Sequence, residues 1–280
     1  MCQLLALNCA VPTAATFSFS GFAARGGLTD HHSDGWGIAF IDGPDVHLLT
    51  DVQPSARSAL AERIKRDAAK CLHTIAHLRK ATRGAIRREN CHPFRRELWD
   101  RNWVFAHNGD LENYAPLPGP QYAPHGDTDS ELAFCMLLEG LQARFGRHEP
   151  EPEALFETLA ALTSGISAHG VFNFVLSNGH AMFTYCSTHL HYVERTWPFA
   201  SAHLIDTDVS IDFTLHMSRE DAVAVIATTP LTDNEAWARF APGTLAMFVD
   251  GRLQGTRTLP VPPAVLAKAN QAPERLREAA

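Results

Sequence analysis

The sequence contains no hydrophobic run approaching the roughly 18 residues that a membrane-spanning helix requires. Its six cysteines include no CxxC pair and follow no regular spacing, which argues against a disulfide framework. Residues 4–7 are too short for the hydrophobic segment of a secretory signal, and no positively charged segment precedes them. We therefore expect a protein of the reducing cytoplasm that has no membrane partner.

A basic surface is also missing. The chain has 24 Lys and Arg against 31 Asp and Glu, a formal net charge of −7, whereas a nucleic-acid-binding domain normally carries a basic stripe. The densest basic stretch, residues 79–96, is interrupted by Glu89 and by His92-Pro93, a pattern typical of loop and pocket surface. We expect no nucleic-acid partner.

The 280 residues, 45% of them hydrophobic, are enough to bury a sizeable core. No internal repeat or low-complexity linker divides the chain. Hydrophobic periodicity predicts helices over 54–69, 128–145 and 153–162, with blocks of strands between and after them. This order predicts an α+β fold in which two stacked sheets are covered by helices on the outside. We assign residues 1–259 to one domain and residues 260–280 to a peripheral C-terminal tail. The predicted strands are 2–7, 36–41, 46–50, 72–78, 103–107, 171–176, 181–186, 189–194, 222–228 and 245–249.

Cys2 directly follows the initiator methionine, and its small side chain favours removal of Met1. Removal would leave one residue with both a thiol and a free α-amine. The amine has a pKa of about 7.7–8.0, so at neutral pH it is suited to accept the thiol proton. Taken alone, a cysteine at the start of a strand is more typical of a buried core residue. The assignment of Cys2 as a nucleophile therefore depends on other clusters.

Two of these clusters follow predicted strands. Arg79, in the segment HLRKAT, can hold a carboxylate in a bidentate grip, although a surface arginine in a basic loop is the alternative. Asn108 and Gly109, in the segment AHNGD, offer a side-chain amide and a backbone N–H that can converge on an oxyanion. The same Asn-Gly pair is also the commonest signal for a hairpin turn.

A third cluster opens the clearest helix. Thr128 and Glu131 have capping-box spacing, which makes Thr128 the expected N-cap and Asp129 the first helical residue. A carboxylate there interacts favourably with the helix dipole. The Asp129 carboxylate is also expected to be free to bind an ammonium group.

In this order, Cys2, HxRxxT at 77–82, HNG at 107–109 and TDSE at 128–131 resemble the class II glutamine amidotransferase domain of the N-terminal-nucleophile hydrolases. The segment DGWG at 34–37 is similar to the stand-alone bacterial members, and the resemblance covers nearly the whole chain. It implies a four-layer αββα sandwich of two mostly antiparallel sheets flanked by helices.

The resemblance also implies a reaction. A cysteine thiolate attacks the side-chain amide carbon of glutamine, ammonia leaves, and water releases glutamate from the thioester. The implied catalytic residues are Cys2, Asn108 and Gly109, and the implied substrate-binding residues are Arg79 and Thr82 for the α-carboxylate and Asp129 for the α-ammonium group. A further set is expected to shape one wall of the pocket: His31, His32, Asp34 and Trp36.

Alternatives remain at this point. Lys80 stands where the large synthases usually carry an aromatic residue, and no synthase domain follows, so an ammonia acceptor would be a separate partner protein. Hydrolysis of glutamine or another γ-glutamyl compound without ammonia transfer uses the same residues. A chain that retains Met1 would at best be a non-catalytic amino-acid-binding protein. No helix carries two histidines and a carboxylate in metal-binding spacing, so we predict no metal and no cofactor, and leave the oligomeric state open.

Overall fold

The computed structural model of the chain describes residues 2–67, 69–81 and 84–271. The described strands form two large sheets in which every neighbouring pair is antiparallel, together with the small hairpin β10 (Ser201–His203) and β11 (Ser210–Asp212). The first large sheet has the order β13 (Ala238–Arg239), β9 (His191–Thr196), β12 (Ala222–Ala227), β1 (Gln3–Ala14), β4 (Lys70–Leu78), β2 (Trp36–Asp42) and β3 (Asp45–Asp51). The second has the order β15 (Arg252–Thr258), β14 (Thr244–Val249), β8 (Met182–Cys186), β7 (Gly170–Ser177), β6 (Arg101–Leu111) and β5 (Phe94–Leu98).

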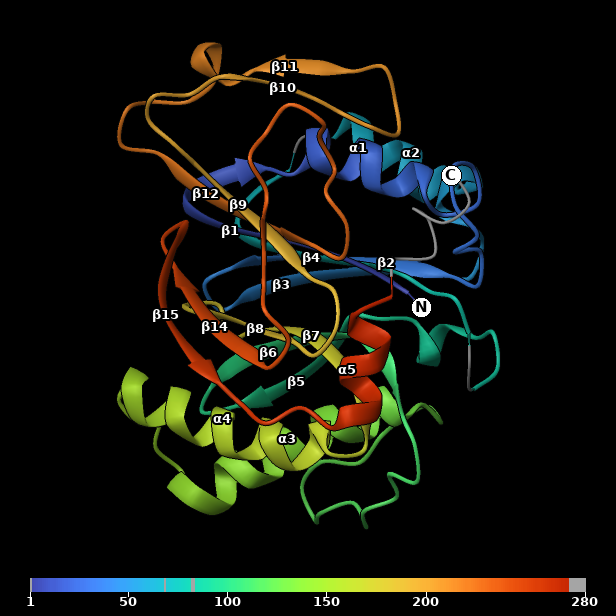
Figure 1. Ribbon diagram of the computed structural model, residues 1–280, viewed down its shortest axis with the longest axis vertical. Coiled ribbons are helices and arrows are strands. Elements are labelled where there is room, and N and C mark those ends of the chain that lie inside the picture. The colour runs from blue at the N-terminus through green and yellow to red at the C-terminus, as the bar shows by residue number, and fades with distance from the viewer. Residues whose placement is uncertain (1, 68, 82–83, 272–280) are drawn as a thin grey trace.

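Helices cover the outer face of each sheet. In Figure 1, α1 (Thr16–Ala24) and α2 (Ala59–Arg66) lie outside the first sheet, and α3 (Asp129–Phe145) and α4 (Pro152–Ser167) lie outside the second. The two sheets face each other between these helix layers. The architecture is thus the four-layer αββα sandwich, and the predicted fold class is confirmed.

The alternation of side chains along β1 shows how the sequence builds these layers. Leu5 and Leu7 belong to the cluster under α1 and α2, whereas Leu4 and Ala6 belong to the cluster between the two sheets. Successive side chains of a strand point to opposite faces, so a strand covered on both faces needs apolar residues at every position. β1 is therefore a central strand of the sandwich, and Cys2 immediately precedes it.

Most elements lie within a few residues of their predicted positions, with two informative differences. The helix expected over 54–69 is a 3-10 turn, Ser55–Arg57, followed by the shorter α2. Ser58 separates them because its backbone is extended and its hydroxyl accepts the Ala61 N–H at 3.4 Å as an N-cap. Helix α1 was not predicted, because TFSFSGFAA has no polar face and hence no amphipathic period.

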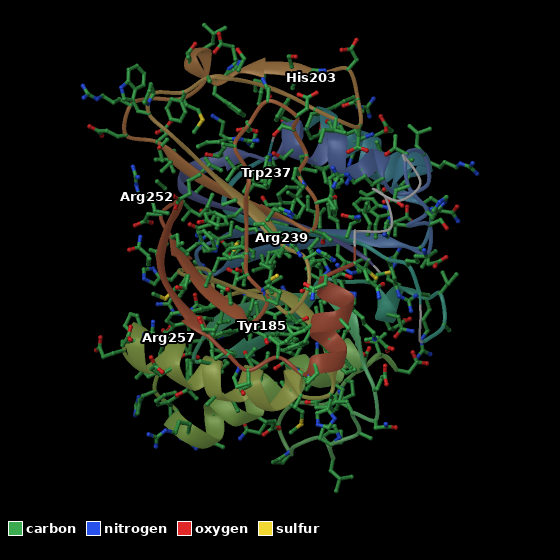
Figure 2. All side chains as sticks on the ribbon, in the orientation of Figure 1. Tyr185, His203, Trp237, Arg239, Arg252 and Arg257 are labelled. Atoms are coloured by element: carbon green, nitrogen blue, oxygen red, sulfur yellow. The ribbon has the colours of Figure 1, made fainter. Side chains whose placement is uncertain are left out.

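Beyond Pro260 the described chain forms α5 (Pro263–Ala269), whose Val265 and Ala269 are buried. Arg239, labelled in Figure 2, donates from Nη2 to the Ala269 carbonyl at 3.0 Å and so fastens this helix to β13. None of the helices in the described residues is both long and apolar enough to cross a membrane.

Candidate active site

Cys2 lies beside the end of β4. Its thiol donates to the Lys80 carbonyl at 3.4 Å, and its Sγ accepts the Lys80 N–H at 3.3 Å. Burial raises the pKa of the thiol, while the Lys80 N–H and the positive charge of Arg79 oppose the rise and the charge of Asp129 adds to it. The thiol is thus within electrostatic reach of the cation and of the carboxylate that the sequence predicted for the site.

Strand pairing explains why Arg79 lies near Cys2. β1 and β4 are antiparallel with Gln3 opposite Leu78. Cys2, which precedes β1, therefore lies next to Arg79, which follows β4. Arg79 is 3% exposed, and its guanidinium donates to the carbonyls of Gly84 and Ala85, each at 3.1 Å. The interpretation as an exposed surface arginine is therefore wrong.

The DGWG segment is hydrogen-bonded to the residues that follow β4. The Asp34 N–H donates to the Arg79 carbonyl at 3.0 Å, and the Asp34 carboxylate accepts the Ala81 N–H at 2.8 Å. Trp36, in contrast, is fully buried and packs against Phe19 under α1, with ring centroids 5.7 Å apart. The expectation that Trp36 forms a pocket wall is wrong, because its position in β2 directs the ring into the outer core. His32 is buried, whereas His31 is exposed.

Asn90 holds the loop that follows Arg79. Its side chain is fully buried and donates to the Ala85 carbonyl at 2.9 Å and to the Asp127 carboxylate at 2.6 Å, and it accepts the Asp127 N–H at 3.1 Å. Arg87 forms an ion pair with the same carboxylate at 3.2 Å. The loop after β4 is thereby fastened to the start of α3, which brings the HxRxxT and TDSE segments together. Thr82 lies outside the described residues.

Asn108 and Gly109 belong to the interior of β6 and not to a turn. β6 continues to Leu111, so the strand expected to end at residue 107 is longer and the hairpin-turn interpretation is wrong. A side chain at Gly109 would place its Cβ 1.8 Å from the Val171 carbonyl oxygen of β7. Close approach of the two strands explains why glycine occupies this position.

Asp129 is the first residue of α3, and Thr128 caps the helix by accepting the Glu131 N–H at 3.2 Å, as predicted. The Asp129 carboxylate is not free: Oδ2 accepts the Leu111 N–H and Oδ1 accepts the Ser130 N–H, at 2.8 and 2.9 Å. These two bonds fix the carboxylate between β6 and α3. Oδ1 also accepts the Ser130 hydroxyl at 3.4 Å, whereas Oδ2 can accept a second hydrogen bond and so keeps capacity for an ammonium ligand.

Buried histidines surround the site. Burial lowers the pKa of His77 to about 3 and that of His92 well below its ordinary value, and their ring centroids are 4.2 Å apart. His107, whose pKa is also lowered by burial, bridges Ser130 of α3 at 2.8 Å and the Val171 carbonyl of β7 at 3.1 Å. At neutral pH these rings are uncharged, and Arg79 is a side-chain cation whose charge acts on Cys2.

Two residues of this region were missed by the sequence analysis, Asn173 and Thr228. Asn173 on β7 donates to the Asn108 carbonyl at 3.0 Å, and its Oδ1 accepts two backbone N–H groups from residues 187 and 188. The Thr228 hydroxyl accepts the Leu4 N–H at 2.9 Å and the Asn108 side-chain amide at 3.3 Å. Neither residue was assigned a role from the sequence, and only the packing of the two sheets brings them to the site.

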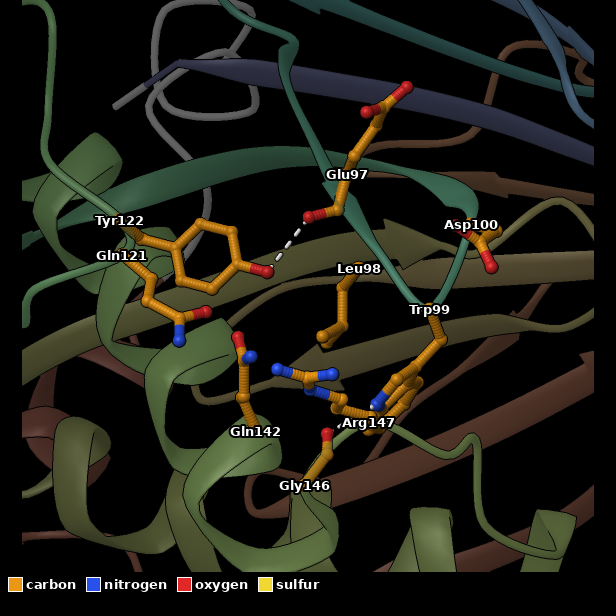
Figure 3. A pocket seen from close by; sticks show the side chains of 9 residues that line it. All are labelled: Glu97, Leu98, Trp99, Asp100, Gln121, Tyr122, Gln142, Gly146 and Arg147. Atoms are coloured by element: carbon orange, nitrogen blue, oxygen red, sulfur yellow. Dashed lines mark hydrogen bonds between the residues drawn. The ribbon is translucent and has the colours of Figure 1, made fainter.

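A separate cavity of about 360 Å³ lies at the β5–β6 turn, near the carboxyl end of α3. Figure 3 shows Tyr122, Trp99 and Arg147 around it, with the Tyr122 hydroxyl donating to the Glu97 carbonyl at 2.8 Å. Its lining shares no residue with the cluster around Cys2. This cavity is therefore distinct from the candidate active site.

Two stacked antiparallel sheets between helix layers, with Cys2 directly before a central strand, form a fold that this chain shares with amidotransferases of known structure. A glutamine phosphoribosylpyrophosphate amidotransferase from B. subtilis shares this fold, with a TM-score of 0.58 and 14% identity over 91% of this chain and 49% of that chain. A family model of the class II glutamine amidotransferases matches residues 1–272. The chain belongs to this family.

Stand-alone bacterial proteins are similar over most of their length. A candidate glutamine amidotransferase from Haemophilus influenzae is 49% identical over 251 residues, which are 90% of this chain and 85% of that protein. YafJ from Escherichia coli, also a candidate glutamine amidotransferase, is 45% identical over 90% of this chain and 98% of its own. The crystal structure of a predicted glutamine amidotransferase from Pseudomonas aeruginosa has a TM-score of 0.72 and 37% identity, covering 90% of this chain and 99% of that one.

Proposed function

We propose that the protein hydrolyses the side-chain amide of glutamine with Cys2 as its nucleophile, after removal of Met1. The observation that carries this proposal is the convergence on one thiol of groups from distant segments. Arg79 follows the strand that pairs with β1 beside Cys2, the Lys80 N–H donates to the Cys2 Sγ at 3.3 Å, and Thr228 joins the strand after Cys2 to Asn108. A buried structural cysteine requires none of these neighbours.

In the proposed reaction the α-amine of Cys2 takes the thiol proton, and the thiolate attacks the amide carbon of the substrate. The negative charge that develops on the carbonyl oxygen is stabilised by the Asn108 amide and the Gly109 N–H; loss of one such donor costs ~3 kcal/mol of barrier. The protonated α-amine returns its proton to the leaving nitrogen, and ammonia departs. Water then attacks the thioester, and glutamate and the free thiol result.

Two charged side chains, Arg79 and Asp129, would recognise the amino-acid head group of the substrate. Arg79 and Thr82 would hold the α-carboxylate, and Asp129 the α-ammonium group. Since the Arg79 guanidinium and the Asp129 carboxylate are already fixed by backbone partners, they would meet the ligand without losing much side-chain entropy. Such preorganisation favours a γ-glutamyl group over other amides.

Intact mass measured before and after incubation with 6-diazo-5-oxo-norleucine, a glutamine-shaped alkylating reagent, tests this function. We expect loss of Met1 and a single adduct that maps to Cys2. Cys2→Ala should fold and lose both the adduct and glutaminase turnover. The matched control is Cys9→Ala, which removes a buried thiol from β1 and should leave both unchanged.

The outcome also separates the alternatives. Retained Met1 with no adduct would refute the enzymatic proposal and favour an amino-acid-binding protein. If Cys2 is alkylated, comparing glutamine with γ-glutamyl amides and peptides as substrates identifies the donor. Release of free ammonia by the isolated protein would indicate hydrolysis, whereas turnover that needs a second protein would indicate an ammonia-accepting partner.

A further inference from the structure

The nucleophile and the proposed oxyanion donor come from different sheets. Cys2 precedes β1 in the first sheet, and Asn108 lies on β6 in the second. Strand pairing within a sheet therefore cannot set the distance between them. A direct contact across the two sheets has to do so.

Thr228 makes such a contact. Its N–H donates to the Leu4 carbonyl at 3.1 Å and its hydroxyl accepts the Leu4 N–H at 2.9 Å, so it extends the β12–β1 ladder by one residue toward Cys2. The same hydroxyl accepts the Asn108 side-chain amide at 3.3 Å. One oxygen atom thus joins the strand of the nucleophile to the amide of the oxyanion donor.

The Asn108 amide depends on this contact for its orientation. Asn108 is fully buried, and within the described part of the chain its Oδ1 has no hydrogen-bond partner. Asn173 fixes the Asn108 carbonyl, but it does not touch the side-chain amide. Within the described residues, the hydrogen bond to the Thr228 hydroxyl therefore restrains rotation of the amide.

Thr228 is itself firmly held. It is 5% exposed, and its carbonyl accepts a hydrogen bond from His191 Nδ1 at 2.9 Å. The next residue, Thr229, accepts hydrogen bonds from buried Arg25 at its carbonyl and hydroxyl, at 3.0 and 2.6 Å. Arg25 is anchored in turn by a buried ion pair with Asp206 at 2.7 Å. This rigidity suits a residue that positions others.

We propose that Thr228 is a positioning residue for the reaction. Its hydroxyl orients the Asn108 amide toward the developing oxyanion and fixes the position of that amide relative to Cys2. The inference rests on the proposed function. One N–H of the amide is held by the hydroxyl, and the other is left to meet the oxyanion. Thr228 does not itself touch the substrate in this scheme.

The test compares Thr228→Val, which keeps the shape and removes the hydroxyl, with Thr228→Ser, which restores it. The rate of Cys2 alkylation by 6-diazo-5-oxo-norleucine is measured against reagent concentration. We expect Thr228→Val to lower the maximal rate about 10- to 100-fold, with the half-saturating concentration changed less than about twofold. Thr228→Ser should recover most of the rate. The matched control is Thr74→Val, which removes a buried hydroxyl bonded to Cys71 on β4.

A second readout does not require activity. In asparagine-labelled protein, the side-chain amide protons of Asn108, assigned by their loss in Asn108→Asp, should exchange faster with solvent in Thr228→Val than in wild type or Thr228→Ser. Unchanged exchange, or alkylation of Thr228→Val at the wild-type rate, would overturn the inference. If the wild type is not alkylated, the proposed function fails, and the exchange measurement alone decides whether Thr228 orients the amide. Should Thr228→Val not fold, Thr228→Ala takes its place in both measurements.

Discussion

Substitution of Gly109 by alanine tests whether the close approach of β6 and β7 positions the oxyanion donor. The added Cβ would lie 1.8 Å from the Val171 carbonyl oxygen and 2.5 Å from His107 Nε2, whereas real contacts of this kind stay above 3.0 Å. The nearer obstacle is backbone, so it cannot move by a change of rotamer. The two strands must separate by about 1 Å at this point, and the Gly109 N–H moves with them.

A misplacement of about 1 Å in a catalytic group costs roughly 100-fold in rate. We therefore expect Gly109→Ala to reduce glutaminase kcat and the rate of Cys2 alkylation by about two orders of magnitude. Overpacking should also lower the free energy of unfolding by about 1–3 kcal/mol, which urea denaturation measures. The rate has to be recorded well below the denaturation midpoint, so that the two effects are separated.

Gly165→Ala is the control for this substitution. Gly165 is an exposed residue of α4, and an added Cβ would meet nothing within 4 Å. It should leave the rate unchanged and raise the free energy of unfolding by about 1 kcal/mol, because alanine favours the helix. If Gly109→Ala reacts as fast as Gly165→Ala, the contact between β6 and β7 does not position the oxyanion donor, and the predicted role of Gly109 is refuted.

Three further substitutions probe the neighbourhood. Arg79→Lys should raise KM about 30-fold, with a smaller change in kcat, because it loses a charge-assisted grip of about 2 kcal/mol; an unchanged KM removes Arg79 from the site. Arg25→Leu should lower the free energy of unfolding in urea by about 3–5 kcal/mol, since it removes the cation that is ion-paired with the buried Asp206 carboxylate. Burial lowers the pKa of His73 to about 4, so protonation favours the unfolded chain: His73 alone should contribute about 3 kcal/mol to the fall in stability as pH drops from 6.5 to 4, and urea denaturation of His73→Gln should show a fall smaller by that amount.

Local sequence was enough where a single segment carries the signal. The capping pair Thr128 and Glu131 predicted the start of α3, and short continuous apolar runs predicted the central strands. Helix α1 could not be predicted in this way, since a helix that is buried on most sides shows no amphipathic period.

For the candidate site, the order of the motifs predicted Cys2, Arg79, Asn108 and Asp129 as site residues, because residue type limits the chemistry that a position can perform. The sequence could not decide whether Asn-Gly forms a turn or a strand interior: that depends on β7, which contributes Val171 from 62 residues further along the chain. The sequence also could not predict the proposed role of Thr228, since that role depends on contacts where β12, β1 and β6 meet. Sequence determined which groups are available, while the stacking of two sheets determined which of them touch, because contacts across layers join residues whose separation along the chain carries no local pattern.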